Sequence, residues 1–132
     1  MSMSHHRETV TAPGAPDAVG PYSHAVKAQG LLFCSGQVAL HPETGELVGT
    51  TAAEQARQCL ENLTAVATAG GGRLADAVRC TVYLADMGDF AAVNEVYAEY
   101  FGESLPARVA FGVSALPKGG LVEIDAIIAL GG

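Results

Sequence analysis

Arg108 lies in the stretch LPARVAFG, residues 105–112, which otherwise alternates like a β-strand. A guanidinium group presents a planar fork of N–H donors that binds a carboxylate through two hydrogen bonds, and it keeps its charge at neutral pH. The small residue Ala110 shares its face of the expected strand and leaves room for a ligand. The pattern equally allows a salt bridge from Arg108 to Glu123 or Asp125, or a subunit contact. Patterning alone leaves these interpretations open.

Glu123 is the candidate general base, because a carboxyl group in a partly apolar setting has a raised pKa and can accept a proton from water. The alternative is a carboxylate on a strand face that is paired with a cation. Tyr22 follows a tight Gly-Pro turn in GPYSHA and either presents its hydroxyl to a site or packs as an aromatic ring. Ser35, in CSGQ, can donate a hydrogen bond to a ligand, and Gly36 permits close backbone approach.

Other catalytic signatures are missing from the sequence. No serine occupies a G-x-S-x-G motif, and the four histidines all precede residue 42 without a helix-spaced partner. The GGG and KGG patches lack the endings of phosphate-binding loops. Cys34, Cys59 and Cys80 sit in apolar settings without a C-x-x-C pair, which indicates reduced core thiols of a cytoplasmic protein. We therefore expect neither a metal site nor a disulfide framework.

The composition indicates one globular domain over residues 1–132, with residues 1–11 as a flexible lead-in. Hydrophobic residues make up 49% of the chain and charged residues 16%, yet no apolar run reaches the ~20 residues of a membrane span. The formal charge of -7 argues against a nucleic-acid partner, because affinity for phosphates comes from clustered Lys and Arg. We expect a soluble protein without a secretory signal.

The expected elements follow from apolar periodicity and from turn and cap residues. In chain order they are strands at 23–29 and 31–37, a helix from the Thr51–Glu54 capping box to Gly70, a strand at 78–85, a helix from an N-cap at Asp89 to about Phe101, and strands at 107–115 and 121–130. This order predicts one sheet with both helices on a single face.

The two faces of that sheet have different expected surroundings. Facing the helices we expect Val78, Cys80, Val82 and Leu84 from one strand, and Val122, Ile124, Ala126 and Ile128 from the last strand. The opposite face would carry Arg108, Glu123 and Asp125 beside Leu121, Ile127 and Ala129, a mixture too apolar for open solvent and too charged for a dry core. Burial against other subunits, with polar pockets at the seams, reconciles the two properties.

Several ordered segments resemble the RidA family of enamine/imine deaminases: GPYSHAV, LLFCSGQ, TVYLADMGDFAAVNEVYAEYF, PARVAFGVSALPKGG and VEIDAI. The resemblance runs from about Ala12 to Ile128. It implies a chorismate-mutase-like α+β fold, with a single, mostly antiparallel mixed sheet and two helices on one face. It also implies a homotrimer with three sites in the clefts between subunits.

The resemblance implies hydrolysis of reactive enamines and imines, such as 2-aminoacrylate, 2-iminopropanoate and 2-iminobutanoate, to 2-keto acids and ammonia. This detoxifying reaction needs no metal or organic cofactor. Arg108 would bind the substrate carboxylate and Glu123 would position and activate water, while Tyr22, Ser35 and Asn94 match positions that line or support the site. Many members carry Cys where this chain has Ala110, which widens the expected pocket, and no thiol chemistry carries over.

A 2-iminobutanoate/2-iminopropanoate deaminase is therefore the leading prediction. Some relatives are called endoribonucleases or translation inhibitors, and the charge of -7 argues against that activity here. The third hypothesis is a trimeric binder of small carboxylate metabolites, or a protein-holding factor, in which Arg108 clamps a carboxylate without turnover. The presence of Glu123 favours the enzyme.

Overall fold

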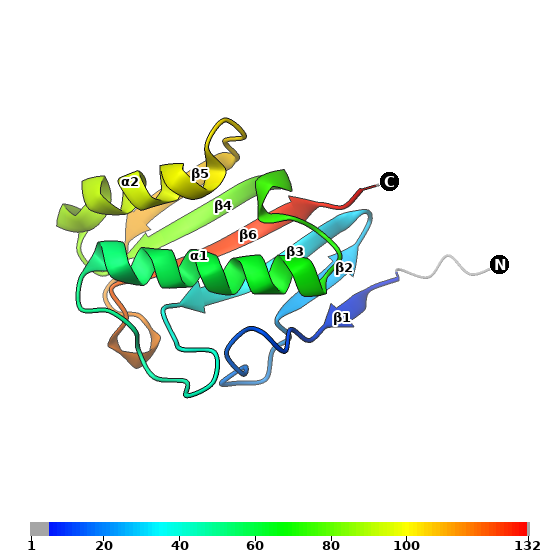
Figure 1. Ribbon diagram of the computed structural model, residues 1–132, viewed down its shortest axis with the longest axis horizontal. Coiled ribbons are helices and arrows are strands. Elements are labelled where there is room, and N and C mark those ends of the chain that lie inside the picture. The colour runs from blue at the N-terminus through cyan, green and yellow to red at the C-terminus, as the bar shows by residue number, and fades with distance from the viewer. Residues whose placement is uncertain (1–5, 132) are drawn as a thin grey trace.

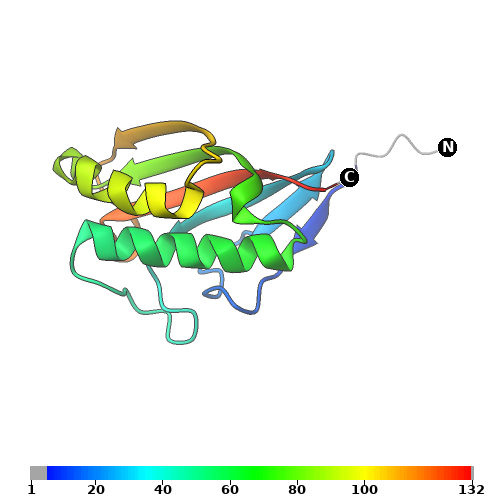
Figure 2. The ribbon, with the colours of Figure 1, turned by 45° about the horizontal axis from the view of Figure 1, so that its top comes forward.

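Six strands form one mixed sheet in the order β1-β2-β3-β6-β4-β5 in the computed structural model, which describes residues 6–131. Figures 1 and 2 show both helices on the same side of this sheet. All neighbouring strands are antiparallel except β4 and β5. The predicted α+β class is confirmed. The strands are β1 Glu8–Val10, β2 Ala25–Ala28, β3 Leu31–Val38, β4 Ala77–Leu84, β5 Ala107–Gly112 and β6 Val122–Ala129, and the helices are α1 Ala52–Ala69 and α2 Phe90–Phe101.

The first helix, α1, begins at the predicted capping box. The Thr51 hydroxyl accepts the Glu54 N–H at 3.2 Å, and the Glu54 carboxylate accepts the Thr51 N–H at 3.2 Å, so two helix-end donors are satisfied. Its apolar stripe is fully buried against the sheet, as predicted: Ala56, Cys59, Leu60, Leu63, Val66 and Ala67. No helix among residues 6–131 is long and apolar enough to cross a membrane.

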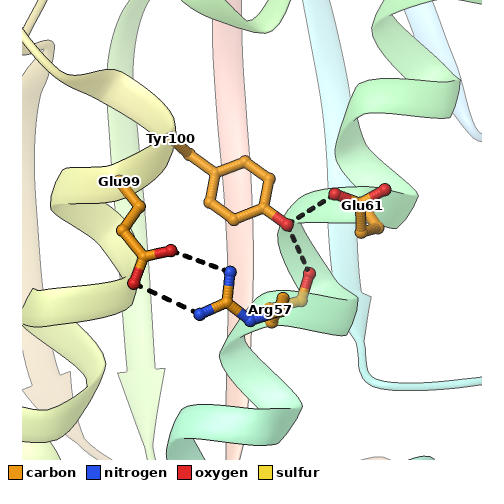
Figure 3. A network of polar contacts seen from close by, with 4 residues as sticks. All are labelled: Arg57, Glu61, Glu99 and Tyr100. Atoms are coloured by element: carbon orange, nitrogen blue, oxygen red, sulfur yellow. Dashed lines mark hydrogen bonds and ion pairs between the residues drawn. The ribbon is translucent and has the colours of Figure 1, made fainter.

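On the solvent side, polar contacts join α2 to α1 (Figure 3). Arg57 donates two hydrogen bonds to the Glu99 carboxylate, at 2.9 and 3.2 Å. The Tyr100 hydroxyl donates to the Glu61 carboxylate on α1. These contacts fix how α2 lies against α1, while the buried stripes of both helices face the sheet.

The start of α2 is capped differently from the prediction. Asp89 does precede the helix, but its side chain makes no capping hydrogen bond. Asp86 instead accepts the Gly88 N–H at 2.8 Å and caps the short 3₁₀ turn Met87–Asp89. The turn therefore takes over the role expected of an N-cap side chain.

The N-terminal segment is more ordered than expected. Glu8–Val10 forms β1, which pairs antiparallel with β2, so the expected flexible lead-in does not extend to residue 11; residues 1–5 lie outside the described part. The predicted β2–β3 hairpin is present. Its two central residues, Gln29 and Gly30, have φ of 56° and 75°, the positive values that a tight type I′ hairpin turn requires.

Val78 does not join the core as predicted. It is 45% exposed, because the β4–β6 register shifts between Ala77 and Arg79, and Ala77 takes the buried position. Such a shift moves a side chain to the other face of the sheet. The remaining predicted core residues of both strands are buried: Cys80, Val82, Leu84, Val122, Ile124, Ala126 and Ile128.

The face assigned to Arg108 was also wrong. In the parallel β4–β5 pair, Arg108 lies opposite Cys80 and Ala110 opposite Val82, and partners in register point to the same side. Arg108 therefore faces the helices, away from Glu123 and Asp125. The larger apolar residues of β5 lie on the open face instead. Alternation was correct, but the assumption that apolar positions face the helices fails on this edge strand.

Two buried polar side chains connect α1 to the chain around the end of the sheet. Gln55 accepts the Leu121 N–H at 2.8 Å and donates to the Gly49 carbonyl at 3.1 Å. Asn62, only 1% exposed, donates to the carbonyls of Val38 at 3.3 Å and Leu40 at 3.0 Å. These side chains thereby provide hydrogen-bond partners for buried backbone groups that are not paired in the hydrogen-bond ladder of the sheet.

We predict that Asn62→Ala lowers the free energy of unfolding by about 1–3 kcal/mol, because it removes the donor that satisfies buried carbonyl groups. Urea unfolding at one fixed protein concentration measures the effect. The exposed α1 variant Thr68→Ala is the control and should leave the midpoint unchanged or slightly raised. Equal midpoints for Asn62→Ala and wild type would contradict this role of Asn62.

Candidate functional site

A hollow of about 440 Å³ is lined by Tyr22, Ser35 and Glu123, three candidates from separate sequence motifs. Tyr22 comes from the loop before β2, Ser35 from β3 and Glu123 from β6. Apolar groups, among them Val19 and Pro117, complete much of its wall. A pocket of this size suits a small molecule, and its few polar groups converge from separate elements.

Glu123 lies directly over Gly36 in this hollow. A Cβ atom on Gly36 would fall 2.1 Å from the Glu123 Oε2 and 2.9 Å from its Cδ, so only glycine allows this carboxyl position. Burial, and secondarily the charge of Asp125, raises the pKa of Glu123 above its ordinary value. A carboxylate with a raised pKa is a stronger proton acceptor, as a general base requires.

The two hydroxyl groups of the hollow have different hydrogen-bonding capacities. Ser35 already donates its proton to the Ser23 carbonyl at 2.6 Å, so in this geometry it accepts from a ligand rather than donating as predicted. The Tyr22 oxygen accepts the Val19 N–H at 3.3 Å and keeps its own proton to donate. Tyr22 is 46% exposed, which rules out packing in the core of this chain.

His24 holds the N-terminal wall of the hollow in place. Its Nδ1 accepts the Ala12 N–H at 2.9 Å, and its Nε2 lies 2.8 Å from the Pro16 carbonyl. These partners are satisfied together when Nε2 carries the proton. Pro16 and Asp17 both line the hollow, so this buried histidine fixes a segment of the site.

Arg108 belongs to a separate group of residues under α2. It donates to the Asn94 Oδ1 at 2.7 Å, and its Cζ lies 5.4 Å from the ring centre of Phe90 and 4.8 Å from that of Tyr97. Ala110 follows on the same face of β5 and is partly buried. Asn94, Ala110 and Arg108 thus come together on the helix side of the sheet, not on the opposite face where the sequence placed Arg108.

Arg108 has no carboxylate partner within residues 6–131, where the ion pairs are Lys27–Glu8, Arg57–Glu99 and Arg73–Asp76. Asp125, an expected candidate, accepts the Thr81 N–H at 3.0 Å and the Tyr83 hydroxyl at 2.8 Å on the other face of the sheet. The proposed salt bridge within one chain is therefore excluded. The alternative of a contact between Arg108 and another subunit stays a prediction.

The three cysteines are free and buried. Burial raises the pKa of the Cys34 thiol to about 12 and that of Cys80 to about 11. These thiols are protonated at neutral pH and supply no nucleophile. Within residues 6–131, His, Cys, Asp and Glu side chains nowhere gather in a group of three that could hold a metal ion.

Sequence reasoning did not assign a site role to Phe90, Tyr97, Asp17 or Pro117. The first two were expected only as parts of a buried stripe, although their spacing with Asn94, at positions 90, 94 and 97, already placed them on one helix face. Pro117 had a local signal, the LPKGG turn just before Glu123. Asp17 had none, because an aspartate in an irregular segment is common.

Comparison with known proteins identifies the family. A family model described as "Endoribonuclease L-PSP" matches residues 12–130. The chain belongs to this family, the RidA family. A RidA protein from the Antarctic bacterium Psychrobacter sp. PAMC 21119 has a solved structure with 46% sequence identity and a TM-score of 0.89, covering 93% of this chain and 99% of that one.

Curated relatives within the RidA family support the same assignment. A "RutC family protein" of Pyrococcus horikoshii is 54% identical over 92% of this chain and 96% of its own length. The "2-iminobutanoate/2-iminopropanoate deaminase" of Mus musculus is 47% identical over 95% of this chain and 93% of its own. These relatives therefore match more than nine-tenths of this chain, and one of them carries an enzyme name.

We predict that Asp125→Asn lowers the pKa of Glu123, because it removes a nearby negative charge that disfavours a second carboxylate. Burial, the larger cause, persists, so the pKa stays above its ordinary value. The folded state favours neutral Glu123, so stability is lost as pH rises from the ordinary to the raised pKa, and Asp125→Asn lessens this loss. NMR titration of the Glu123 carboxyl carbon measures the shift.

Asp76→Asn is the control for this titration, because Asp76 lies beyond the opposite end of β4 and pairs with Arg73. It should leave the Glu123 titration unchanged. An unaltered Glu123 pKa in Asp125→Asn would show that Asp125 has no electrostatic effect on the site.

Proposed function

We propose that the chain is a deaminase that hydrolyses 2-iminobutanoate and 2-iminopropanoate, and the enamines in equilibrium with them, to 2-keto acids and ammonia. The observation that carries this proposal is the presence of two complementary groups, a cation and a proton acceptor. Arg108 offers an unneutralised cation for a carboxylate, and Glu123 offers a proton acceptor with a raised pKa in a hollow. The name of the mouse relative supports the same reaction.

The active site is composed of residues from two copies of the chain. Arg108 and Glu123 lie on opposite faces of one sheet, so a single chain cannot present both to one small substrate. A homotrimer with sites at its seams resolves this, with Arg108, Asn94 and Ala110 from one subunit and Tyr22, Ser35 and Glu123 from the next. Large apolar side chains on the open face, each 41–45% exposed, would be covered by the neighbours: Phe33, Val78, Val109 and Phe111.

Substrate binding starts from the carboxylate that all these imines share. Arg108 binds it through a charge-assisted, two-point contact, which fixes both the position and the plane of the adjacent imine carbon. Because that carbon is already electrophilic, orientation and a well-placed water supply most of what the reaction needs. Neither a metal nor an organic cofactor enters the proposed steps.

Glu123 then manages the protons of the hydrolysis. A water oxygen adds to C2 of the imine while the Glu123 carboxylate accepts one water proton, and this proton passes to the imine nitrogen. The new hydroxyl next loses its proton to Glu123, the C2–O bond becomes a carbonyl, and the C2–N bond breaks. Glu123 returns this proton to the departing nitrogen. The balance is imine plus water to 2-keto acid plus ammonia.

The remaining site residues set orientation and selectivity. Tyr22 can donate its phenol proton to a substrate or to the attacking water, and Ser35 can accept a hydrogen bond. Ala110, beside Arg108, leaves more room for the substrate side chain than the family's common cysteine, so we propose that it tunes side-chain preference. The buried, reduced thiols support a cytoplasmic site of action.

The family description also names an endoribonuclease, but an overall charge of -7 and two carboxylates on the hollow, Asp17 and Glu123, disfavour RNA. The alternative of a trimer that binds a carboxylate metabolite without turnover shares the Arg108 half of the site. It leaves the raised pKa of Glu123 without a role.

We predict that Arg108→Ala and Glu123→Gln each lose activity, and that mixed trimers containing both variants regain it. Loss of the charge-assisted contact in Arg108→Ala should lower kcat/KM about 10- to 150-fold. In a mixed trimer with either 2:1 composition, one seam joins an intact Arg108 to an intact Glu123, so about one third of the wild-type rate returns.

The measurement uses two differently tagged variants, co-expressed and purified through both tags. A pyridoxal-phosphate threonine dehydratase generates the imine, and semicarbazide trapping reports how fast the free imine disappears. Wild-type-like activity of Arg108→Ala alone would end the catalytic assignment. Mixed trimers as inactive as the parents, or a monomer on sizing, would end the shared-site proposal.

A further inference from the structure

We propose that Phe90, Asn94 and Tyr97 form a neutral clamp that positions the Arg108 guanidinium for an anionic ligand without neutralising it. The inference rests on the proposed function, in which Arg108 anchors a substrate carboxylate. It adds Phe90 and Tyr97 as positioning residues and gives a reason why they are uncharged. The clamp residues occupy one face of α2, spaced four and three residues apart, and face Arg108 on β5.

The contacts hold the guanidinium from more than one side. Its Cζ lies 4.8 Å from the Tyr97 ring centre and 5.4 Å from that of Phe90, within the range at which a ring face attracts a cation. Asn94 Oδ1 accepts one N–H at 2.7 Å. A guanidinium has five N–H donors, so most remain free for a ligand.

The neutrality of the clamp distinguishes Arg108 from other arginines of the chain. Arg57 and Arg73 each donate two hydrogen bonds to a carboxylate, Glu99 and Asp76 (Figure 3 shows the former). A carboxylate at Arg108 would compete with the ligand for the same donor fork and cancel the charge that attracts it. Aromatic faces and an amide oxygen order the side chain while leaving a net charge of +1.

The hydroxyl of Tyr97 is not part of the clamp. It lies beside the Cys80 thiol and, within the described chain, has no hydrogen bond of ordinary geometry. The ring of Tyr97, which is 5% exposed, provides both core packing and the face beneath Arg108. The ring and the hydroxyl can therefore be tested separately.

The experiment measures binding of 2-oxobutanoate, a stable 2-keto acid, to the assembled protein by calorimetry. Phe90→Leu and Tyr97→Leu should each raise Kd about 5- to 30-fold, because each removes a ring face from the cation. Tyr97→Phe keeps the ring and should rescue binding. Tyr100→Leu is the matched control: it removes an aromatic ring from the same helix, but Tyr100 contacts Glu61 on α1 rather than Arg108 (Figure 3).

Asn94 provides the test of neutrality. Asn94→Asp keeps the shape and strengthens the hydrogen bond to Arg108, yet it should weaken 2-oxobutanoate binding more than Asn94→Ala does. A merely structural role for Asn94 predicts the opposite order. Asn94→Asp binding as tightly as Asn94→Ala would overturn the claim that the clamp must be neutral.

A readout without ligand tests the geometry itself. The side-chain proton resonances of Arg108, identified by their loss in Arg108→Lys, should be shifted upfield by ring currents in wild type. They should move downfield in Phe90→Leu and Tyr97→Leu and stay in place in Tyr100→Leu. Wild-type resonances and wild-type Kd in folded Phe90→Leu and Tyr97→Leu would overturn the clamp.

Failure of the clamp and failure of the deaminase proposal give different results. If wild-type protein binds 2-oxobutanoate without accelerating imine hydrolysis, and Phe90→Leu and Tyr97→Leu weaken this binding, the deaminase proposal is contradicted and the clamp is supported. If wild-type protein is active but Phe90→Leu and Tyr97→Leu bind 2-oxobutanoate as tightly as wild type, the clamp is contradicted and the deaminase proposal stands. Wild-type protein that does not bind 2-oxobutanoate removes the anchor role of Arg108, and the clamp with it.

Discussion

The parallel pairing of β5 with β4 sets the arrangement of the two charged groups of the candidate site. With Arg108 opposite Cys80, the guanidinium is directed under α2, while Glu123 on β6 points to the other face of the sheet. One chain therefore carries two separated halves of a charge pair. Within the described chain the cation has no carboxylate partner, and burial, with the nearby charge of Asp125, raises the pKa of the Glu123 carboxyl. Arg108 is therefore suited to bind an anionic group of a ligand, and Glu123 is suited to accept a proton.

Much of the fold could be read from local patterns, because its signals act over a few residues. The Thr51–Glu54 capping box, the stripe of α1 and the alternation of β6 all behave as their spacing indicates. The wrong predictions concern strand pairing, which joins residues that are distant in the sequence. The irregularity at Ala77 moves Val78 out of the core, and the face occupied by Arg108 depends on which strand β5 pairs with. Periodicity gives the alternation of a strand but not which face meets the helices.

The sequence names candidate site residues but does not give their arrangement. Tyr22, Ser35 and Glu123 do share a hollow, and Arg108 does meet Asn94, although patterning gave no distance between any of them. The supports of the site come from buried polar groups with weak sequence signals. His24 holds one wall through backbone atoms of residues 12 and 16, and Asn62 holds residues 38 and 40. Such contacts depend on chain positions far apart in sequence, so no local window contains them.

The three buried cysteines have a consequence for chemical durability. Burial raises the pKa of the Cys34 thiol to about 12, so this thiol is protonated at neutral pH, and Cys59 and Cys80 are fully enclosed. Sulfur that is neither ionised nor exposed reacts slowly with oxidants and with electrophilic carbon. The three cysteines are therefore poorly reactive. In the proposed deaminase, thiols of this kind would not be consumed by the reactive imine substrate.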